Sequence, residues 1–240
     1  MTPRGRIHSG ATPFFATMTL PAKTPQERAS ATSAQEEDAI KGQIRKSNEN
    51  RILAAAEKVF ARTGFSGATM AAIATASGLP KANLHYYFGS KDVLYRAALA
   101  RTLSDWLAPA QGITADADPR TALERYIRVK MELSAKRPDG SKVFANEMLH
   151  GAPVVKNILT TELRPMVAEK AAVIQGWIDA GRMAPVDPTH LFFTIWAATQ
   201  TYADFDVQVC AVLGRKALTG KDHARATEHV VSLLMRGCGL

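Results

Sequence analysis

The chain's apolar residues follow a helical pattern from residue 48 onward. Ile52, Ala56 and Val59 recur three or four positions apart, as on one face of an amphipathic helix, and Thr63-Gly64 ends the run. No segment alternates apolar and polar residues with the two-residue period of a half-buried strand. The pattern therefore predicts an all-α fold.

Two short helices are predicted next, over residues 69–76 and 81–87, with a turn at Ser77-Gly78-Leu79-Pro80 between them. A longer helix begins after Ser90, a good N-cap residue, and ends at Pro109. The two short helices have the length and spacing of a helix-turn-helix, whose second helix enters the major groove of DNA.

Further helices are predicted to begin at two Asp-Pro pairs, residues 118–119 and 187–188, because aspartate caps a helix and proline fits its first turn. Gly181 ends the helix before the second pair. The helix over residues 189–209 is apolar almost all round, and a last helix covers residues 224–235.

The pattern divides the chain into three parts. Residues 1–44 show no helical or strand periodicity and are rich in small and polar residues, so we expect a disordered tail, in which Met18 is an alternative start to Met1. Residues 45–92 form the predicted helix-turn-helix domain. Residues 93–240 form the predicted effector-binding and dimerisation domain.

The net charge of +8 is concentrated in one part of the chain. Residues 41–101 hold 10 basic and 3 acidic residues, whereas the balance is 0 over residues 1–40 and +1 over residues 102–240. A confined basic excess suits a polyanion such as nucleic acid or an anionic membrane surface. It coincides here with the predicted helix-turn-helix, which favours double-stranded DNA as the partner.

Other classes of protein fit less well. No run reaches the roughly 18–20 apolar residues of a membrane-spanning helix. Residues 11–20 lack the continuous apolar centre of a secretory signal. We therefore expect a cytoplasmic protein with no membrane partner. Two cysteines are too few for a disulfide framework or a cysteine zinc site. Glu147 and His150 have a di-iron spacing without the second copy that such a site needs. We predict no enzyme activity, no metal and no cofactor.

The predicted DNA contacts fall in two groups. Exposed positions of the second short helix are placed at base edges, and residues at helix starts or ahead of the first helix are placed at phosphates. Any one of them alone could equally be a core aromatic or a surface charge. The predicted residues are Arg45, Lys46, Thr69, Lys81, Ala82, Asn83, His85, Tyr86, Tyr87 and Lys91.

These residues lie in a segment that resembles the TetR-type transcriptional repressors. The resemblance rests on Thr69, Ile73-Ala74, Gly78-Leu79, Leu84, Tyr87-Phe88, Ser90-Lys91 and Leu94. Two positions depart from it, because Pro80 replaces a small hydroxyl residue and His85 stands where tyrosine is frequent. The resemblance implies an all-helical homodimer that binds a DNA operator and carries a small-molecule effector in its C-terminal domain.

The effector prediction centres on Trp196 and Gln200, which are one helical turn apart and share a face. A buried indole beside a primary amide suits a flat polar heterocycle such as uracil or thymine. A core tryptophan with a backbone-bonded glutamine is the alternative interpretation.

The C-terminal half looks like the pyrimidine-utilisation subgroup of the same family. The matching stretches include Asp105-Trp106-Leu107-Ala108-Pro109, Glu147-Met148-Leu149, Gly151-Ala152-Pro153 and Trp196-Ala197 through Tyr202-Ala203-Asp204-Phe205. This resemblance implies a regulator of pyrimidine catabolism that senses uracil or thymine. It adds Trp106, Asn146 and Tyr202 as weaker effector candidates beside Trp196 and Gln200.

Two alternatives stay open. One is a regulator of efflux or of another pathway that senses a larger apolar ligand, for which the candidate side chains are Met131, Met148, Phe192 and Phe193. The other is a nonspecific DNA-binding dimer without an effector. Dimerisation is assigned to the helix that contains Trp196 and to the last helix, through Val230, Val231 and Leu234. In the resembled family, release of DNA by the effector is the commoner arrangement.

Overall fold

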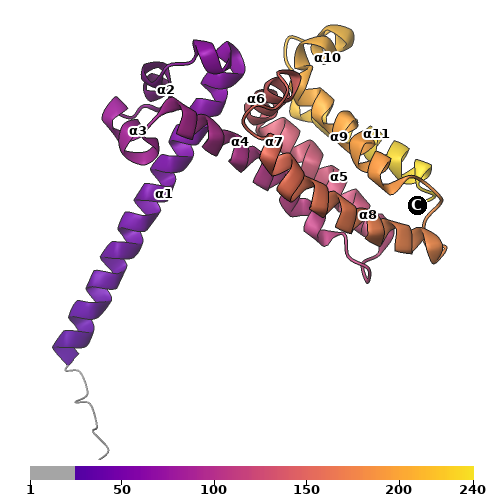
Figure 1. Ribbon diagram of the computed structural model, residues 1–240, viewed down its shortest axis with the longest axis horizontal. Helices are drawn as coiled ribbons and strands as arrows, with labels where there is room; N and C mark the ends of the chain where they lie inside the picture. Colours follow the sequence, from indigo (N-terminus) through magenta and orange to yellow (C-terminus); the bar gives the residue numbers. More distant parts are fainter. Residues whose placement is uncertain (1–24) are drawn as a thin grey trace, which may run out of the picture. The chain divides into compact units, whose positions relative to one another are not determined.

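The computed structural model describes residues 25–240, with side chains described from residue 39, and all its regular elements are helical. Figure 1 labels the α-helices and colours the chain from its N-terminus to its C-terminus. The elements are α1 Pro25–Gly67, α2 Met70–Ser77, α3 Lys81–Phe88, α4 Lys91–Leu107, the 3₁₀ helix η1 Ala108–Gly112, α5 Pro119–Lys136, α6 Pro138–Leu149, α7 Lys156–Ile158, the π-helical turn η2 Leu159–Leu163, α8 Arg164–Asp179, α9 Pro188–Asp204, α10 Asp206–Leu213 and α11 Gly220–Gly237. The all-α prediction is confirmed.

The chain divides into two units, residues 1–46 and residues 47–240. The predicted disordered tail, residues 1–44, is wrong from Pro25 onward, because α1 already begins there. Residues 25–44 contain no proline after Pro25 and are rich in Ala, Glu and Gln, which favour a helix by propensity. Residues 1–24, with the alternative start Met18, lie outside the described residues.

Residues 47–88 build the helix-turn-helix head. Gly64 interrupts α1 with φ 69° and ψ 175°, which confirms the predicted stop. The Thr69 hydroxyl caps α2 by accepting a hydrogen bond from the Ala72 N–H, and Gly78 supplies the left-handed turn before α3. Ile73 of α2 and Leu84 of α3 are fully buried against the apolar face of α1.

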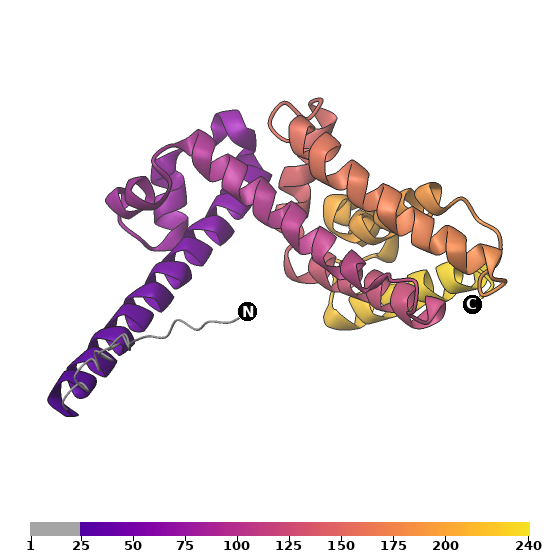
Figure 2. The same ribbon diagram turned by 60° about the horizontal axis from the view of Figure 1, so that its bottom comes forward.

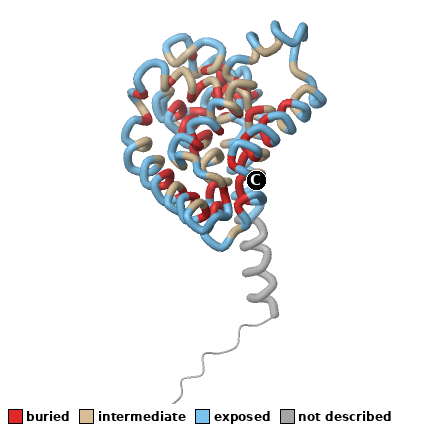
Figure 3. The backbone as a smooth tube through the Cα atoms, turned by 90° about the vertical axis from the view of Figure 1, so that its right-hand side faces the viewer, coloured by how far each residue is buried: buried red, intermediate tan, exposed pale blue. Residues whose placement is uncertain are grey.

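The C-terminal part is a helical bundle around its own core. α4 runs from the head into this bundle (Figure 2), where α5 packs on α9 and α11. Buried residues lie on the inward faces of the bundle helices and exposed residues on the outward faces (Figure 3). Aspartates 118 and 187 cap α5 and α9 through their side chains, as the two Asp-Pro pairs predicted.

Two predictions about the C-terminal helices need correction. The helix predicted over residues 189–209 breaks at Phe205 (φ −118°, ψ 33°), and α10 begins at Asp206. The sequence has no glycine or proline at this break that would have indicated it. The predicted dimer residues Val230, Val231 and Leu234 are buried in the protomer's own core. The apolar face of α11 is therefore already occupied within one chain.

Candidate DNA-binding surface and effector cavity

The second helix of the helix-turn-helix presents several predicted DNA contacts to solvent. Lys81, Ala82, His85 and Tyr86 of α3 are exposed, and Tyr86 is 76% exposed despite its large ring. Asn83 on the same helix is half-buried. An exposed aromatic and several donors on one short helix are what base recognition in a major groove requires.

Tyr87 and Thr69 are tied into the head. The Tyr87 hydroxyl accepts a hydrogen bond from the Asn48 amide of α1 at 3.3 Å, and its ring packs edge-to-face on Tyr86. The Thr69 hydroxyl is engaged as the α2 cap. Tyr87 thus links α3 to α1 and Thr69 fixes the start of α2, and their predicted phosphate contacts stay predictions.

Lys91 makes contacts within the protein that the sequence did not predict, and its predicted phosphate contact stays a prediction. Its ammonium donates hydrogen bonds to the carbonyl oxygens of Phe65 and Ala68, at 2.8 and 3.0 Å, and lies 4.4 Å from the centre of the Phe65 ring. The side chain therefore fastens the start of α4 to the segment around the end of α1. Carbonyl groups at a helix end attract a cation, which explains this placement.

Arg45 and Lys46 are exposed residues of α1. They belong to the unit of residues 1–46, whereas α2 and α3 belong to the unit of residues 47–240. Their predicted phosphate contacts stay predictions.

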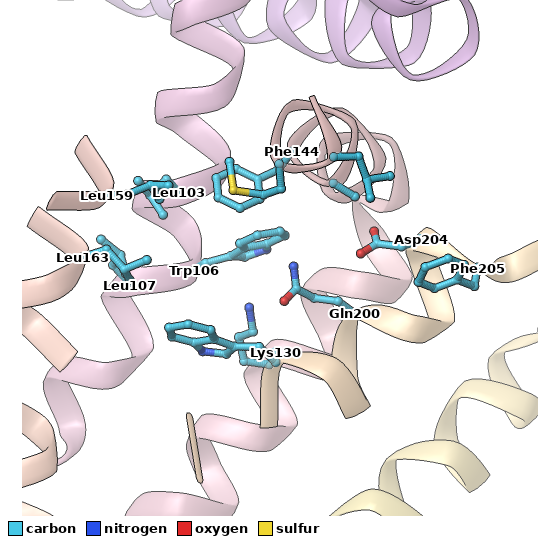
Figure 4. Close-up of a pocket in the computed structure, with 14 residues that line it drawn as sticks. Leu103, Trp106, Leu107, Lys130, Phe144, Leu159, Leu163, Gln200, Asp204 and Phe205 are labelled. Carbon is cyan, nitrogen blue, oxygen red and sulfur yellow. The ribbon is translucent and has the colours of Figure 1, made fainter. Parts of the chain in front are cut away.

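A cavity of about 390 Å³ lies in the bundle, with walls from α4, α5, α6, η2 and α9. Trp106, Trp196 and Gln200 line it together, as predicted. Most of the remaining wall is aliphatic or aromatic (Figure 4). The other lining residues are Leu103, Leu107, Lys130, Phe144, Ala145, Met148, Leu149, Leu159, Leu163, Asp204 and Phe205.

Two predicted effector residues lie elsewhere. Asn146 lines a separate cleft beside residues 61–66, because it is on a different side of α6 from Phe144 and Met148. Tyr202 lines grooves beside α10 and α11, because two residues beyond Gln200 a helix has turned by about 200°. Neither residue lines the cavity of Trp196 and Gln200, and their predicted contacts with an effector stay predictions.

The two cavity tryptophans are held in place by different partners. The Trp196 indole N–H donates a hydrogen bond to the Tyr126 hydroxyl at 2.8 Å. Trp106 packs edge-to-face on Phe144, with the ring centres 4.9 Å apart. Because the Trp196 N–H is already satisfied inside the protein, this residue offers a ligand its ring surface and no further hydrogen bond.

Sequence reasoning missed the two charged residues of the cavity. Lys130 of α5 is 2% exposed, and its ammonium lies 4.1 Å from the centre of the Trp106 ring. Burial lowers the pKa of Lys130 to about 7, while the nearby Asp204 carboxylate partly opposes that shift. Asp204 accepts a 2.5 Å hydrogen bond from the Ser141 hydroxyl, and burial raises the pKa of its carboxyl.

The side chains proposed for a larger apolar ligand are mostly outside the cavity. Met131 and Phe192 are buried in the bundle core, and Phe193 is 49% exposed on the outer face of α9. Only Met148 of the four lines the cavity.

α6, which forms part of the cavity wall, is tied to α1 of the head at its start and to α4 near its end. At its start, Arg137 donates a 2.5 Å hydrogen bond to Glu57 of α1, which is 4% exposed, and it also pairs with Asp105 of α4. Near its end, Glu147 accepts a 3.0 Å hydrogen bond from the Tyr95 hydroxyl of α4. Glu147 also accepts hydrogen bonds from the next loop's N–H groups, so its carboxylate serves structure.

A helix-turn-helix head joined to a helical bundle that encloses a small cavity defines a DNA-binding transcriptional regulator with a place for a small ligand. Residues 52–98 match the model of bacterial regulatory proteins, tetR family, and residues 99–240 match that of the YcdC-like protein, C-terminal region. The chain belongs to the TetR family. Members of this family are transcriptional regulators and not enzymes. Because the chain belongs to a family of regulators, the alternative of a nonspecific DNA-binding dimer is set aside.

Individual relatives agree with this assignment. The chain is 43% identical over 186 residues to the HTH-type transcriptional regulator RutR of Escherichia coli K12, covering 78% of this chain and 88% of RutR. It is 27% identical over 144 residues to the HTH-type transcriptional repressor NicS of Pseudomonas putida KT2440, covering 60% and 67% of the two chains. The structure of AibR in complex with isovaleryl coenzyme A and operator DNA shares the fold, with a TM-score of 0.58, 17% identity and coverage of 78% and 98%. None of the helices within residues 25–240 is long and apolar enough to span a membrane.

Proposed function

We propose that this protein is a homodimeric repressor whose affinity for its DNA operator is controlled by uracil or thymine, and that it acts on genes of pyrimidine catabolism. The observation that carries the proposal is the cavity, where Trp106, Trp196 and Gln200 meet. Two indole rings and one amide suit a flat ring with a polar edge. The resemblance of the C-terminal half to the pyrimidine-utilisation subgroup supports the same ligand class, and the 43% identity to the regulator RutR supports the regulator class.

The DNA half of the proposal rests on α3. Two copies of this helix in a dimer enter successive major grooves about 34 Å apart, as in other helix-turn-helix dimers, and read a pseudo-palindromic operator. Lys81, Asn83 and Tyr86 contact bases, and exposed basic residues of the head neutralise phosphates.

Control by the ligand follows from the contacts of α4 and α6. α4 carries Trp106 and continues into the head, and α6 carries Phe144 and is tied to the head through Arg137. A ligand that separates or draws together these two walls changes the position of the head. A coupling of only about 2.7 kcal/mol changes operator affinity 100-fold.

Isothermal titration of uracil into the purified protein, with thymine and cytosine as comparators, tests the ligand half. We expect saturable binding of uracil or thymine, and its loss in Gln200→Leu while DNA binding is unchanged. Thr194→Val, a change of similar size on the exposed side of α9, is the matched control. Absence of uracil and thymine binding would remove the proposal and leave the regulator class intact.

A larger apolar ligand is the second candidate, because four leucines from α4 and η2 line one wall of the cavity: Leu103, Leu107, Leu159 and Leu163. The same titration decides between the two. If a hydrophobic fluorescent dye binds in this cavity and uracil does not displace the dye, the result supports an apolar ligand.

A further inference from the structure

A second hollow lies at the end of the bundle, in a groove where α5, α9, α10 and α11 meet. Its volume is about 520 Å³, within the range of small-molecule sites, and it shares no lining residue with the cavity of Trp106 and Gln200. One wall is α10, which has no buried residue along its length and lies beside the end of α9 (Figure 1). The described side chains leave this groove unfilled.

Two polar groups in the lining of this groove are buried without a hydrogen-bonding partner. Ser134 of α5 is 3% exposed, and no hydrogen bond of its hydroxyl is found within residues 39–240. The Nδ1 atom of His223 on α11 is fully buried and has no partner in the same range. Folded proteins normally pair such atoms, because a buried donor or acceptor that has lost its water costs free energy. The groove is where a missing partner can enter.

The loop between α10 and α11 adds positive charge to the groove. Arg215 and Lys216 line it, directly after Gly214 ends α10 in a left-handed conformation. The Arg215 Nε lies 3.6 Å from the Asp222 carboxylate, which holds the guanidinium in place and leaves its terminal nitrogens for another acceptor. Lys216 is exposed and makes no ion pair among the described residues.

The groups of the groove that are not already bound are mainly hydrogen-bond donors. Asp206 is the one carboxylate in the lining, and Lys142 compensates its charge through a 2.8 Å hydrogen bond. Residues 205–225 hold four basic and two acidic residues, so the surrounding segment is also positive. Two cationic side chains beside a hydroxyl and an imidazole suit an anion. The apolar part of the lining includes Pro138, Val207, Ala211 and Leu218.

We propose that this groove binds a small organic anion, which is a carboxylate or a phosphate ester carried on a compact apolar body. Arg215 and Lys216 bind the anionic group. The Ser134 hydroxyl and His223, with its proton on Nδ1, donate hydrogen bonds to oxygens of the ligand. The apolar side chains of the lining cover its body. The site lies outside the cavity assigned to uracil, so this inference goes beyond the proposed function and does not depend on it.

Isothermal titration of the whole chain with three small probes tests the proposal. The probes are benzoate, phenyl phosphate and benzyl alcohol, which carry a carboxylate, a phosphate ester and a neutral hydroxyl group on a similar ring. The variants are Lys216→Met and Ser134→Ala in the groove, with Lys221→Met as the matched control. Lys221 is an exposed lysine of the same segment and does not line the groove. A fourth variant, Lys130→Met, reports binding in the other cavity.

We expect the native protein and Lys221→Met to bind at least one of the two anions saturably. That anion should bind at least about tenfold more tightly than benzyl alcohol, because charge-assisted hydrogen bonds are the stronger ones. Lys216→Met should bind the anion about 5- to 10-fold more weakly at low salt and leave benzyl alcohol unchanged. Ser134→Ala should bind the anion about 3- to 10-fold more weakly. Lys130→Met should bind it like the native protein.

The outcomes separate the two kinds of anion and the two cavities. Binding of benzoate alone supports a carboxylate ligand, binding of phenyl phosphate alone supports a phosphate ester, and binding of both supports a site for either group. Binding of neither anion, equal binding of benzyl alcohol, or native affinity in Lys216→Met or Ser134→Ala overturns the anion site. A loss in Lys130→Met without a loss in Lys216→Met assigns the anion to the bundle cavity and also overturns the proposal. None of these results changes the prediction that uracil binds beside Trp196 and Gln200.

Discussion

Substitution of Lys91 distinguishes a role in stabilising the head from a role in binding DNA. Its ammonium bonds to the carbonyls of Phe65 and Ala68 and lies over the Phe65 ring. We expect Lys91→Met to destabilise the protein by about 2–3 kcal/mol, because each half-buried hydrogen bond contributes about 1 kcal/mol and the cation–π contact about 0.5–1 kcal/mol. For a chain of this size that lowers the unfolding midpoint by roughly 5–10 °C.

The assay is thermal unfolding followed by circular dichroism, together with operator binding measured over a range of salt concentrations. Lys58→Met, a change at an exposed lysine of the same head, should leave the midpoint unchanged. If Lys91 instead holds a phosphate, its loss leaves the midpoint unchanged and reduces the slope of log K against log salt by about 0.9 per contact. That result would refute the anchoring role derived from the structure.

Three further predictions concern the recognition helix, the connection to the head and the cavity lysine. Lys81→Ala and Asn83→Ala should each weaken operator binding, measured by fluorescence anisotropy, by about 1–3 kcal/mol, and the circular dichroism spectrum should be unchanged. Native operator affinity in both variants would contradict the assignment of α3 as the recognition helix. Arg137→Gln should lower the free energy of unfolding, measured in urea, by about 3 kcal/mol, because it leaves the buried Glu57 with only the more distant Arg101. The same variant should reduce the effect of uracil on DNA affinity. An unchanged effect of uracil would exclude coupling through the Arg137–Glu57 pair. Burial lowers the pKa of Lys130, which lines the cavity, to about 7, and a ligand oxygen beside its ammonium would raise that pKa. Uracil affinity should then be highest below pH 7 and fall by up to about tenfold per pH unit above it, and a flat profile from pH 6 to 8.5 would contradict contact between Lys130 and the ligand.

Features that depend on a few neighbouring residues could be predicted from the sequence. The caps at Ser90, Asp118 and Asp187 form as their residue types suggest, since a side chain that accepts a nearby N–H needs no distant partner. Gly64 and Gly78 break the helices where expected because their backbone conformations suit glycine.

The cavity could be predicted only in part. Trp196 and Gln200 follow from helical spacing, and the same rule carried one turn further would have found Asp204. Lys130 could not be found this way, because a lysine in an amphipathic helix normally faces water and only the packing of α5 against α9 buries it. The helical tail was missed because its stability depends on residue propensity and leaves no apolar stripe to detect.

The most direct measurement of ligand-controlled DNA binding uses an operator selected from a random duplex pool. The affinity of the purified protein for that duplex is measured by fluorescence anisotropy as uracil is added, with cytosine as the comparator. We expect uracil to change the dissociation constant by about 100-fold in a saturable manner, and cytosine to have no effect. A dissociation constant that stays the same at saturating uracil and thymine would contradict control of this regulator by a pyrimidine.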